Sequence, residues 1–195
     1  MSRYNKLPFQ RGKTAYQNNS DDLTVTTLAH LEGQKVYLPN SAAATPETRR
    51  NGTDVVAVVV RNVEGSALAA GTAVQWKTGY HGTRVEAADG GAEKAVAGFV
   101  DDHIGSGGVQ NNDLFYMIVE GPVVAVTLDG TAHTGSNYVE GYRMFLSGTS
   151  GKIEGFADAD GSLKTTASAP FNSVGRVLTT VAKDAGTVLL DVKIT

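Results

Sequence analysis

Val96-Ala97-Gly98-Phe99-Val100 and Ser173-Val174-Gly175-Arg176-Val177 are two copies of one short pattern: a small residue, a glycine, any residue and a valine. In both places a polar loop and then a hydrophobic strand follow the pattern. Glycine inside a strand permits a bulge or the close crossing of another strand, where a Cβ would clash. The repetition therefore predicts one β unit that the chain uses twice.

The segments around the two copies also occur in the same order. Residues 71–76 precede the first copy as residues 141–146 precede the second, and residues 114–126 and 186–194 close the two units. Two copies are too few for a solenoid, which needs about three repeats to bury a continuous face. We therefore expect a mainly β fold: a compact β-barrel-like or β-sandwich domain, with a β-tulip-like form as one option, made of two related halves.

The polarity of the chain suggests where its domains begin and end. Residues 1–53 are expected to form an N-terminal arm with a short β-hairpin and a loop, and residues 54–195 to form the β domain. The two halves of that domain are expected at about residues 54–128 and 129–195.

Further local signals concern a hairpin, a long apolar segment and two glycine-rich excursions. Residues 23–28 and 35–38 flank Glu32-Gly33-Gln34, which predicts a hairpin with a glycine turn. Residues 114–126 form either one long bent strand or two strands broken at Gly121-Pro122, because proline cannot donate to a central ladder. Two glycine-rich excursions, residues 79–91 and 148–170, are expected to be held out for contact.

Composition limits the classes of protein that fit. The chain has 195 residues, of which 41% are hydrophobic, enough for one sizeable core. It has no cysteine, which excludes disulfides and thiolate chemistry. The first residues, Met1 to Lys6, precede no apolar stretch that would act as a secretory signal, and no run is long enough to span a membrane. We expect synthesis as a soluble product in the cytoplasm.

Charge is distributed unevenly along the chain. Residues 1–20 contain four basic residues and no acidic one, whereas residues 21–195 contain 13 basic and 20 acidic residues. A basic arm ahead of an acidic body can lie on an acidic neighbour or on phosphate, although a solvated terminus has the same pattern.

No catalytic signature accompanies these features. The four histidines lack the spacing of a metal site, and Asp101-Asp102-His103, the densest polar cluster, is expected to be a solvated loop whose side chains do not converge. Asp158-Ala159-Asp160 resembles the start of a calcium loop, but Ala169 stands where a bidentate glutamate is needed. We expect neither an enzyme nor a cofactor, and a hydrolase or metal site at Asp101 and His103 is the weakest alternative.

Most aromatic residues lie inside hydrophobic stretches and are expected in the core or in a subunit interface. Tyr80, between Gly79 and His81, is the expected exposed exception. A carbohydrate-binding module, or a fibre or tail component of a virion, is therefore the alternative function. It would use Tyr80, Asp101, Asp102 and residues 111–113.

The order of a basic arm, a Val-rich β body, the paired glycine patterns and a terminal strand at residues 186–194 resembles small phage virion proteins that decorate or cement an icosahedral head. The resemblance covers about residues 54–195 and fits several decoration families. It implies a protein on the capsid surface that ties neighbouring subunits together, with the major capsid protein and its own copies, as a homotrimer, as partners. It implies no membrane partner, and nucleic acid is not expected as one.

Under this resemblance the arm supplies the contacts with the capsid, since an extended arm can add a strand to a neighbour. The basic residues would complement an acidic capsid surface, and these are Arg3, Lys6, Arg11 and Lys13. The apolar and aromatic residues would anchor the arm, and these are Leu7, Pro8, Phe9 and Tyr16.

Overall fold

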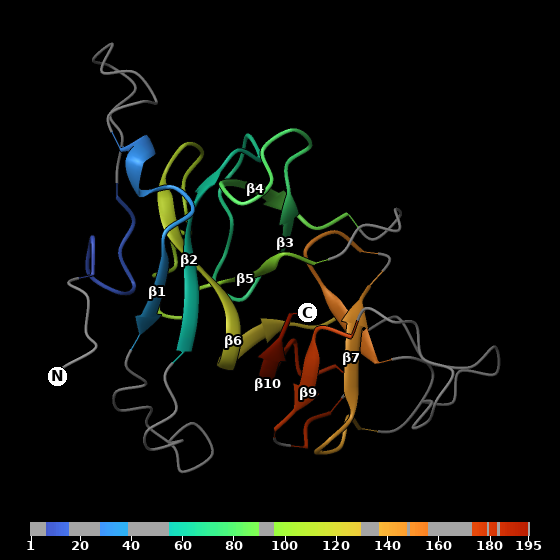
Figure 1. The fold of residues 1–195 in the computed structure, drawn as a ribbon. Coiled ribbons are helices and arrows are strands. Elements are labelled where there is room, and N and C mark those ends of the chain that lie inside the picture. Colours follow the sequence, from blue (N-terminus) through green and yellow to red (C-terminus); the bar gives the residue numbers. More distant parts are fainter. Residues whose placement is uncertain are drawn as a thin grey trace, which may run out of the picture.

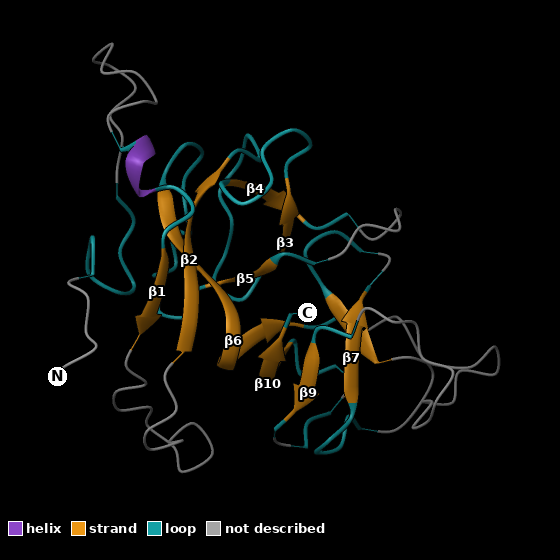
Figure 2. Cartoon of the chain, viewed as in Figure 1, coloured by secondary structure: helices purple, strands orange, loops and turns teal. Residues whose placement is uncertain are grey.

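The computed structural model describes residues 7–15, 28–38, 55–89, 96–129, 137–147, 149–155, 173–178, 180–182 and 184–194, and no side chains for residues 123–125. Strands dominate these residues, and the single helical element among them is a short 3-10 helix (Figure 2). The expected mainly β, barrel-like fold is confirmed.

The elements follow one another in a simple order along the chain. They are η1 (Ala29–Leu31), β1 (Lys35–Leu38), β2 (Val55–Asn62), β3 (Ala73–Trp76), β4 (Arg84–Ala87), β5 (Gly98–Val100), β6 (Leu114–Thr127), β7 (Arg143–Leu146), β8 (Ile153–Gly155), β9 (Gly175–Val177) and β10 (Thr187–Lys193). No helix among the described residues is both long and apolar enough to cross a membrane.

The first ring of strands closes on itself. Its strands are hydrogen-bonded in the order β2-β4-β3-β5-β6, and β6 pairs with β2 to close the ring. The β2–β4 pair is parallel and the other pairs are antiparallel. A closed ring leaves no free edges between its strands, which is how small β-barrels avoid unwanted pairing.

A second ring is built from the far end of the same long strand. β6 continues into pairing with β10, and the order then runs through β9 and β7 to β8 (Figure 1). A parallel bridge between Leu128 and Ile153 brings β8 back to the residue that follows β6. β6 therefore belongs to both rings.

The two rings share parts of their strand registers. Four pairs in the first ring have counterparts of the same type in the second: Val74↔Gly98 and Met144↔Gly175, Trp76↔Val85 and Leu146↔Ile153, Asn62↔Val85 and Leu128↔Ile153, Arg61↔Leu114 and Thr127↔Thr187. The two rings are therefore built alike around the strand that they share, and the division into halves at about residues 128 and 129 stays a prediction.

The glycines of the repeated pattern occupy equivalent places. A Cβ on Gly98 would lie 2.6 Å from the carbonyl oxygen of Ile118 in β6. A Cβ on Gly175 would collide with the carbonyl oxygen of Asp191 in β10. The pattern therefore marks the point where each ring brings a strand against its closing strand, as the sequence suggested.

β6 is one continuous strand across Gly121-Pro122, so the first of the two options for this segment is correct. Its first part pairs with β2 as far as Glu120, and its second part pairs with β10 from Glu120 onward. Proline is tolerated here because the strand changes partners at this point.

The structure adds detail to three local expectations. β1 forms where a strand was expected, but its partner is β2, so this strand belongs to the main sheet and its Val36 and Leu38 are buried in the core. Residue 28 lies in a turn ahead of η1, and residues 23–27 lie outside the described residues. The two excursions hold strands of their own, β4 and β8, because each folds back as the second arm of a hairpin.

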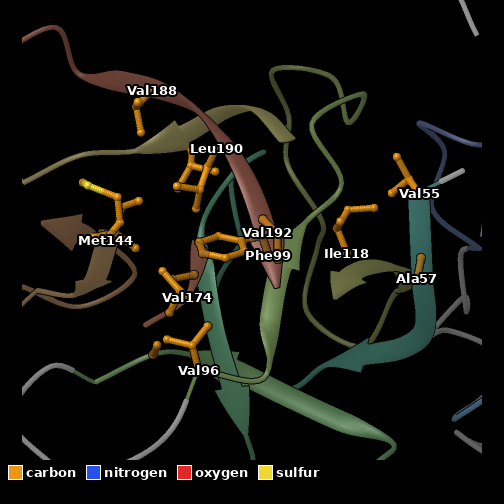
Figure 3. Close-up of a cluster of buried hydrophobic side chains, with 14 of the residues drawn as sticks. Val55, Ala57, Val96, Phe99, Ile118, Met144, Val174, Val188, Leu190 and Val192 are labelled. Carbon is orange, nitrogen blue, oxygen red and sulfur yellow. The ribbon is translucent and has the colours of Figure 1, made fainter. Parts of the chain in front are cut away.

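The alternating faces of the strands form two hydrophobic clusters. In β6, Phe115 and Met117 belong to the smaller cluster, with Val60, Val74, Val85 and Val100 from the other strands of the first ring. Leu114, Tyr116 and Ile118 face the larger cluster, which joins the two halves. Figure 3 shows Phe99 of the first ring among Val174, Leu190 and Val192 of the second.

Candidate functional site

The described part of the arm, residues 7–15, lies against the body, and we call it the N-terminal segment. Ala15 forms an antiparallel bridge with Leu114, with N–H to C=O distances of 3.0 and 3.2 Å. On the same edge of β6, the last backbone bond from the β5 side runs from Asp101 N–H to Tyr116 C=O. The N-terminal segment thus takes the place on β6 that the chain after β5 has left.

Phe9 is held on Tyr116 by its ring and by its backbone. The two rings stack with centroids 4.3 Å apart and planes inclined by 16°. The hydroxyl of Tyr116 donates to the carbonyl oxygen of Phe9 at 2.6 Å and accepts from its N–H at 3.2 Å. Burial raises the pKa of Tyr116 above its usual value of 10, so the hydroxyl keeps the proton that it donates.

Arg11 is held by two carboxylates. Its Nε donates to Asp101 and its Nη2 to Asp102, both at 3.2 Å. Asp101 is fully buried and the side chain of Arg11 is only 13% exposed, so water screens this pair less than an ordinary surface ion pair.

Gly12 lets the chain turn against the same carboxylate. Its N–H donates to the second oxygen of Asp101 at 3.2 Å. Its φ is +75°, and a Cβ there would lie 2.7 Å from the carbonyl oxygen of His103. Any larger residue would strain the backbone and push the N-terminal segment off the body.

His103 completes the cluster from the other side. Its Nδ1 lies 2.9 Å from Asp102 and 3.5 Å from Asp101. Hydrogen bonds to Asp101 and Asp102 raise the pKa of His103 to about 9, against partial burial and the charge of Arg11. Two cations, Arg11 and His103, therefore face two carboxylates at neutral pH.

Asp101, Asp102 and His103 converge, with ligand atoms all within 4.8 Å of one another, so the expectation that they diverge was wrong. That expectation assumed a strand. The chain leaves β5 at Val100 and turns, with Ile104 N–H bonded to Asp101 C=O, and a turn can aim neighbouring side chains at one point. The cluster is filled by Arg11, which makes it an anchor for the N-terminal segment.

The predicted arm residues differ in burial, and some of them lie outside the described residues. Leu7 and Phe9 are partly buried against the larger core cluster, and Pro8 is half-buried. Lys13 is exposed. Arg3, Lys6 and Tyr16 lie outside the described residues. That any of these residues contacts a capsid stays a prediction.

Sequence reasoning missed the partners of the arm, Tyr116 and Asp101. Tyr116 was assigned to the core in general terms, and Asp101 to a solvated loop. The available signal was the complementary charge of Arg11 and the Asp101-Asp102 pair. Arg11 and Asp101 are 90 positions apart in the chain, and no local sequence pattern reveals a contact between residues so distant.

Tyr80 is 47% exposed, in the turn between β3 and β4. The guanidinium of Arg84 lies 4.4 Å from the centre of its ring, an attractive cation–π arrangement that fixes the ring. The role of Tyr80 in contacting a partner stays a prediction.

A shallow recess of about 300 Å³ lies where the two rings meet, with Glu64, Thr72, Thr127 and Lys152 in its wall. The carboxylate of Glu64 accepts a hydrogen bond from Ala87 N–H at 2.8 Å, so it helps to hold the loop before β3 on β4. The recess brings together no group of titratable side chains comparable to the one around Arg11 in the part of the chain that the structure describes.

No family model and no curated protein matches the chain. A solved structure entitled "The capsid of Myoviridae Phage XM1" contains a chain that is similar to this one, with 19% identity and a TM-score of 0.45, over 73% of this chain and 86% of that chain.

Proposed function

We propose that this protein is a structural component of a phage particle, which binds the outer surface of the capsid and cements neighbouring capsid subunits. The observation that carries the proposal is the way the N-terminal segment attaches. The segment pairs with the edge of β6 through the Ala15–Leu114 bridge. Its Phe9 ring stacks on Tyr116, and its Arg11 forms an ion pair with Asp101. Strand addition of this kind joins surfaces without a preformed pocket, as assembly contacts do.

The polar side chains of the body support a structural role. Arg61 is fully buried and pairs with Glu32 at 2.6 Å, and Ser147 donates to the buried carboxylate of Asp129 at 2.5 Å. These groups hold strands and loops together and are shielded from any substrate. Their burial favours a protein that works through its surface.

In this proposal the body is the rigid unit and the arm makes the contact with the major capsid protein. Arg3, Lys6 and Lys13 would meet acidic groups of the capsid, and a homotrimer would multiply weak contacts by avidity. Clamping then follows from interface area added across the junction between subunits.

The test uses capsids of the phage that encodes the chain, stripped of this protein. Full-length protein should co-sediment with them and raise the temperature at which they release DNA. A triple variant, Arg3→Glu, Lys6→Glu and Lys13→Glu, should bind at least tenfold more weakly, because each substitution reverses a charge. Tyr37→Ala, at a side chain 51% exposed on β1 of the main sheet, is the control beyond residues 1–20. Full-length protein that fails to bind the capsids would contradict the proposal, and a triple variant that binds normally would remove the arm from it.

A carbohydrate-binding role, in a module or in a fibre or tail component, is the second candidate, and the exposed ring of Tyr80 favours it. Arg84 covers the ring on one side, which leaves an aromatic surface fixed in place for a sugar. Glycan-array binding that disappears in Tyr80→Ala would support this role over cementing.

A further inference from the structure

We propose that the surface formed by Asp101, Asp102, His103, Leu114 and Tyr116 is a peptide-recognition site, which binds residues 7–15 of a neighbouring copy as well as those of its own chain. We call this surface the segment site. The inference goes beyond the proposed capsid role and does not depend on it. The partner is a second copy of this chain, whose N-terminal segment completes the site.

The contacts in the segment site are selective for a short sequence. Phe9 needs the ring and hydroxyl of Tyr116, Arg11 needs the two carboxylates, and Gly12 needs the absence of a Cβ. Together these contacts read Phe-x-Arg-Gly. A site that reads side chains and backbone at three of four consecutive positions has the features of a binding site for an extended peptide.

The second ring supplies an internal control for this interpretation. The backbone bond from Asp101 N–H to Tyr116 C=O corresponds to the bond from Leu178 N–H to Leu189 C=O in the second ring. The β unit therefore folds with leucine at both positions. A buried aspartate and a tyrosine hydroxyl are not needed to build the unit, so in the first ring they serve the N-terminal segment.

Exchange of the N-terminal segment between copies breaks no contact that it does not form again. The same bonds form whether the N-terminal segment comes from its own chain or from a neighbour, so exchange changes little besides the connection. Residues 16–27, which connect Ala15 to Leu28, have a fully extended reach of about 40 Å. That reach exceeds the roughly 30 Å diameter of a small domain.

Concentration decides which arrangement prevails. A tethered segment has an effective concentration in the millimolar range. Copies held side by side in an assembly present their segments to one another at a similar concentration. Segments should therefore dock on neighbours wherever copies are crowded, and on their own chain when the protein is dilute.

The absence of cysteine makes a direct test available, because introduced thiols have no competitors. Ala15 and Leu114 form a hydrogen-bonded antiparallel pair, whose Cα atoms lie about 5.5 Å apart, within the range of a disulfide. One chain carries Ala15→Cys and the other Leu114→Cys. Mild oxidation of the mixture at about 1 mM should give a covalent heterodimer, whose yield falls when Arg11→Ala is added to the first chain.

The double variant Ala15→Cys and Leu114→Cys, oxidised at high dilution, is the control for geometry, because it should close a bridge within one chain. If it does so while the mixture yields no heterodimer at 1 mM, exchange is ruled out. Equal yields with and without Arg11→Ala would also overturn the proposal, since they indicate random collision.

A second measurement does not require a cysteine at the buried position 114. A labelled peptide of residues 7–15 should bind a variant that lacks residues 1–15, as measured by fluorescence anisotropy. Replacing Gly12 or Arg11 by alanine in the peptide should weaken binding by about tenfold or more. Should the truncated protein not fold, the same peptide is offered to full-length Phe9→Ala, whose own segment is weakened. No binding to either folded protein at 1 mM would reject the segment site.

Discussion

Phe9 and Tyr116 lie 107 positions apart in the chain, yet the tyrosine hydroxyl bonds both backbone groups of Phe9 while the two rings stack. The side chain of Tyr116 thus contacts both the backbone and the ring of Phe9. This contact joins the arm to the long strand that both rings share.

The first prediction concerns this hydroxyl. Tyr116→Phe keeps the stacked ring but leaves the N–H and C=O of Phe9 without their partner, and we expect a loss of about 1–2 kcal/mol in the free energy that holds the N-terminal segment on the body. Hydrogen exchange at the Phe9 amide should become faster. Tyr37→Phe, at an exposed tyrosine, should leave this exchange unchanged. Unchanged exchange in Tyr116→Phe would mean that the ring alone holds the segment.

The second prediction concerns the glycines of the repeat. Gly98→Ala and Gly175→Ala each force a Cβ against a carbonyl oxygen of the closing strand, so each should lower the free energy of unfolding by about 2 kcal/mol or more. Gly105→Ala is the control, because no atom lies within 4 Å of its added Cβ. Urea denaturation measures all three, and equal stabilities would refute the role assigned to the pattern.

The third prediction compares a buried ion pair with an exposed one. Glu32→Ala leaves the fully buried guanidinium of Arg61 without its carboxylate and should destabilise the protein by about 3 kcal/mol. Lys77→Ala breaks the pair with Glu86, where the lysine is 44% exposed and solvent screens the charges, so it should destabilise the protein far less. Chemical denaturation distinguishes the two, and similar losses would show that Arg61 finds another partner.

The fourth prediction concerns pH. The pKa of His103 is raised from 6.5 to about 9 in the folded protein, so the folded state binds the proton more tightly than the unfolded state. The resulting stabilisation is fully present below pH 6.5 and is lost as the pH rises through 9. His103→Gln should flatten the pH dependence of the unfolding free energy between pH 6.5 and 9.5. If the variant kept the wild-type slope of unfolding free energy against pH, another titratable group would be responsible for that slope.

Local patterns in the chain were enough to determine its class and its repeat. Valine-rich runs of strand length, the glycine in each copy and the matching order of residues 71–76 and 141–146 predicted a mainly β fold with two related halves. These features depend on neighbours in the chain, because strand preference and the steric demand of a Cβ are local properties. The partner of each strand is not a local property, and no pattern in the sequence indicated that β1 pairs with β2.

Only the tertiary structure decided how the ends and the polar residues are used. Arg11 was assigned to a partner surface and Asp101 to a solvated loop, and the fold brings them to 3.2 Å of each other. The continuity of β6 through Pro122 also depended on the two rings, since a proline is tolerated where a strand changes partners. Contacts over about a hundred positions depend on the closure of the rings, which is a property of the whole chain, and the repeat of the sequence carries no trace of them.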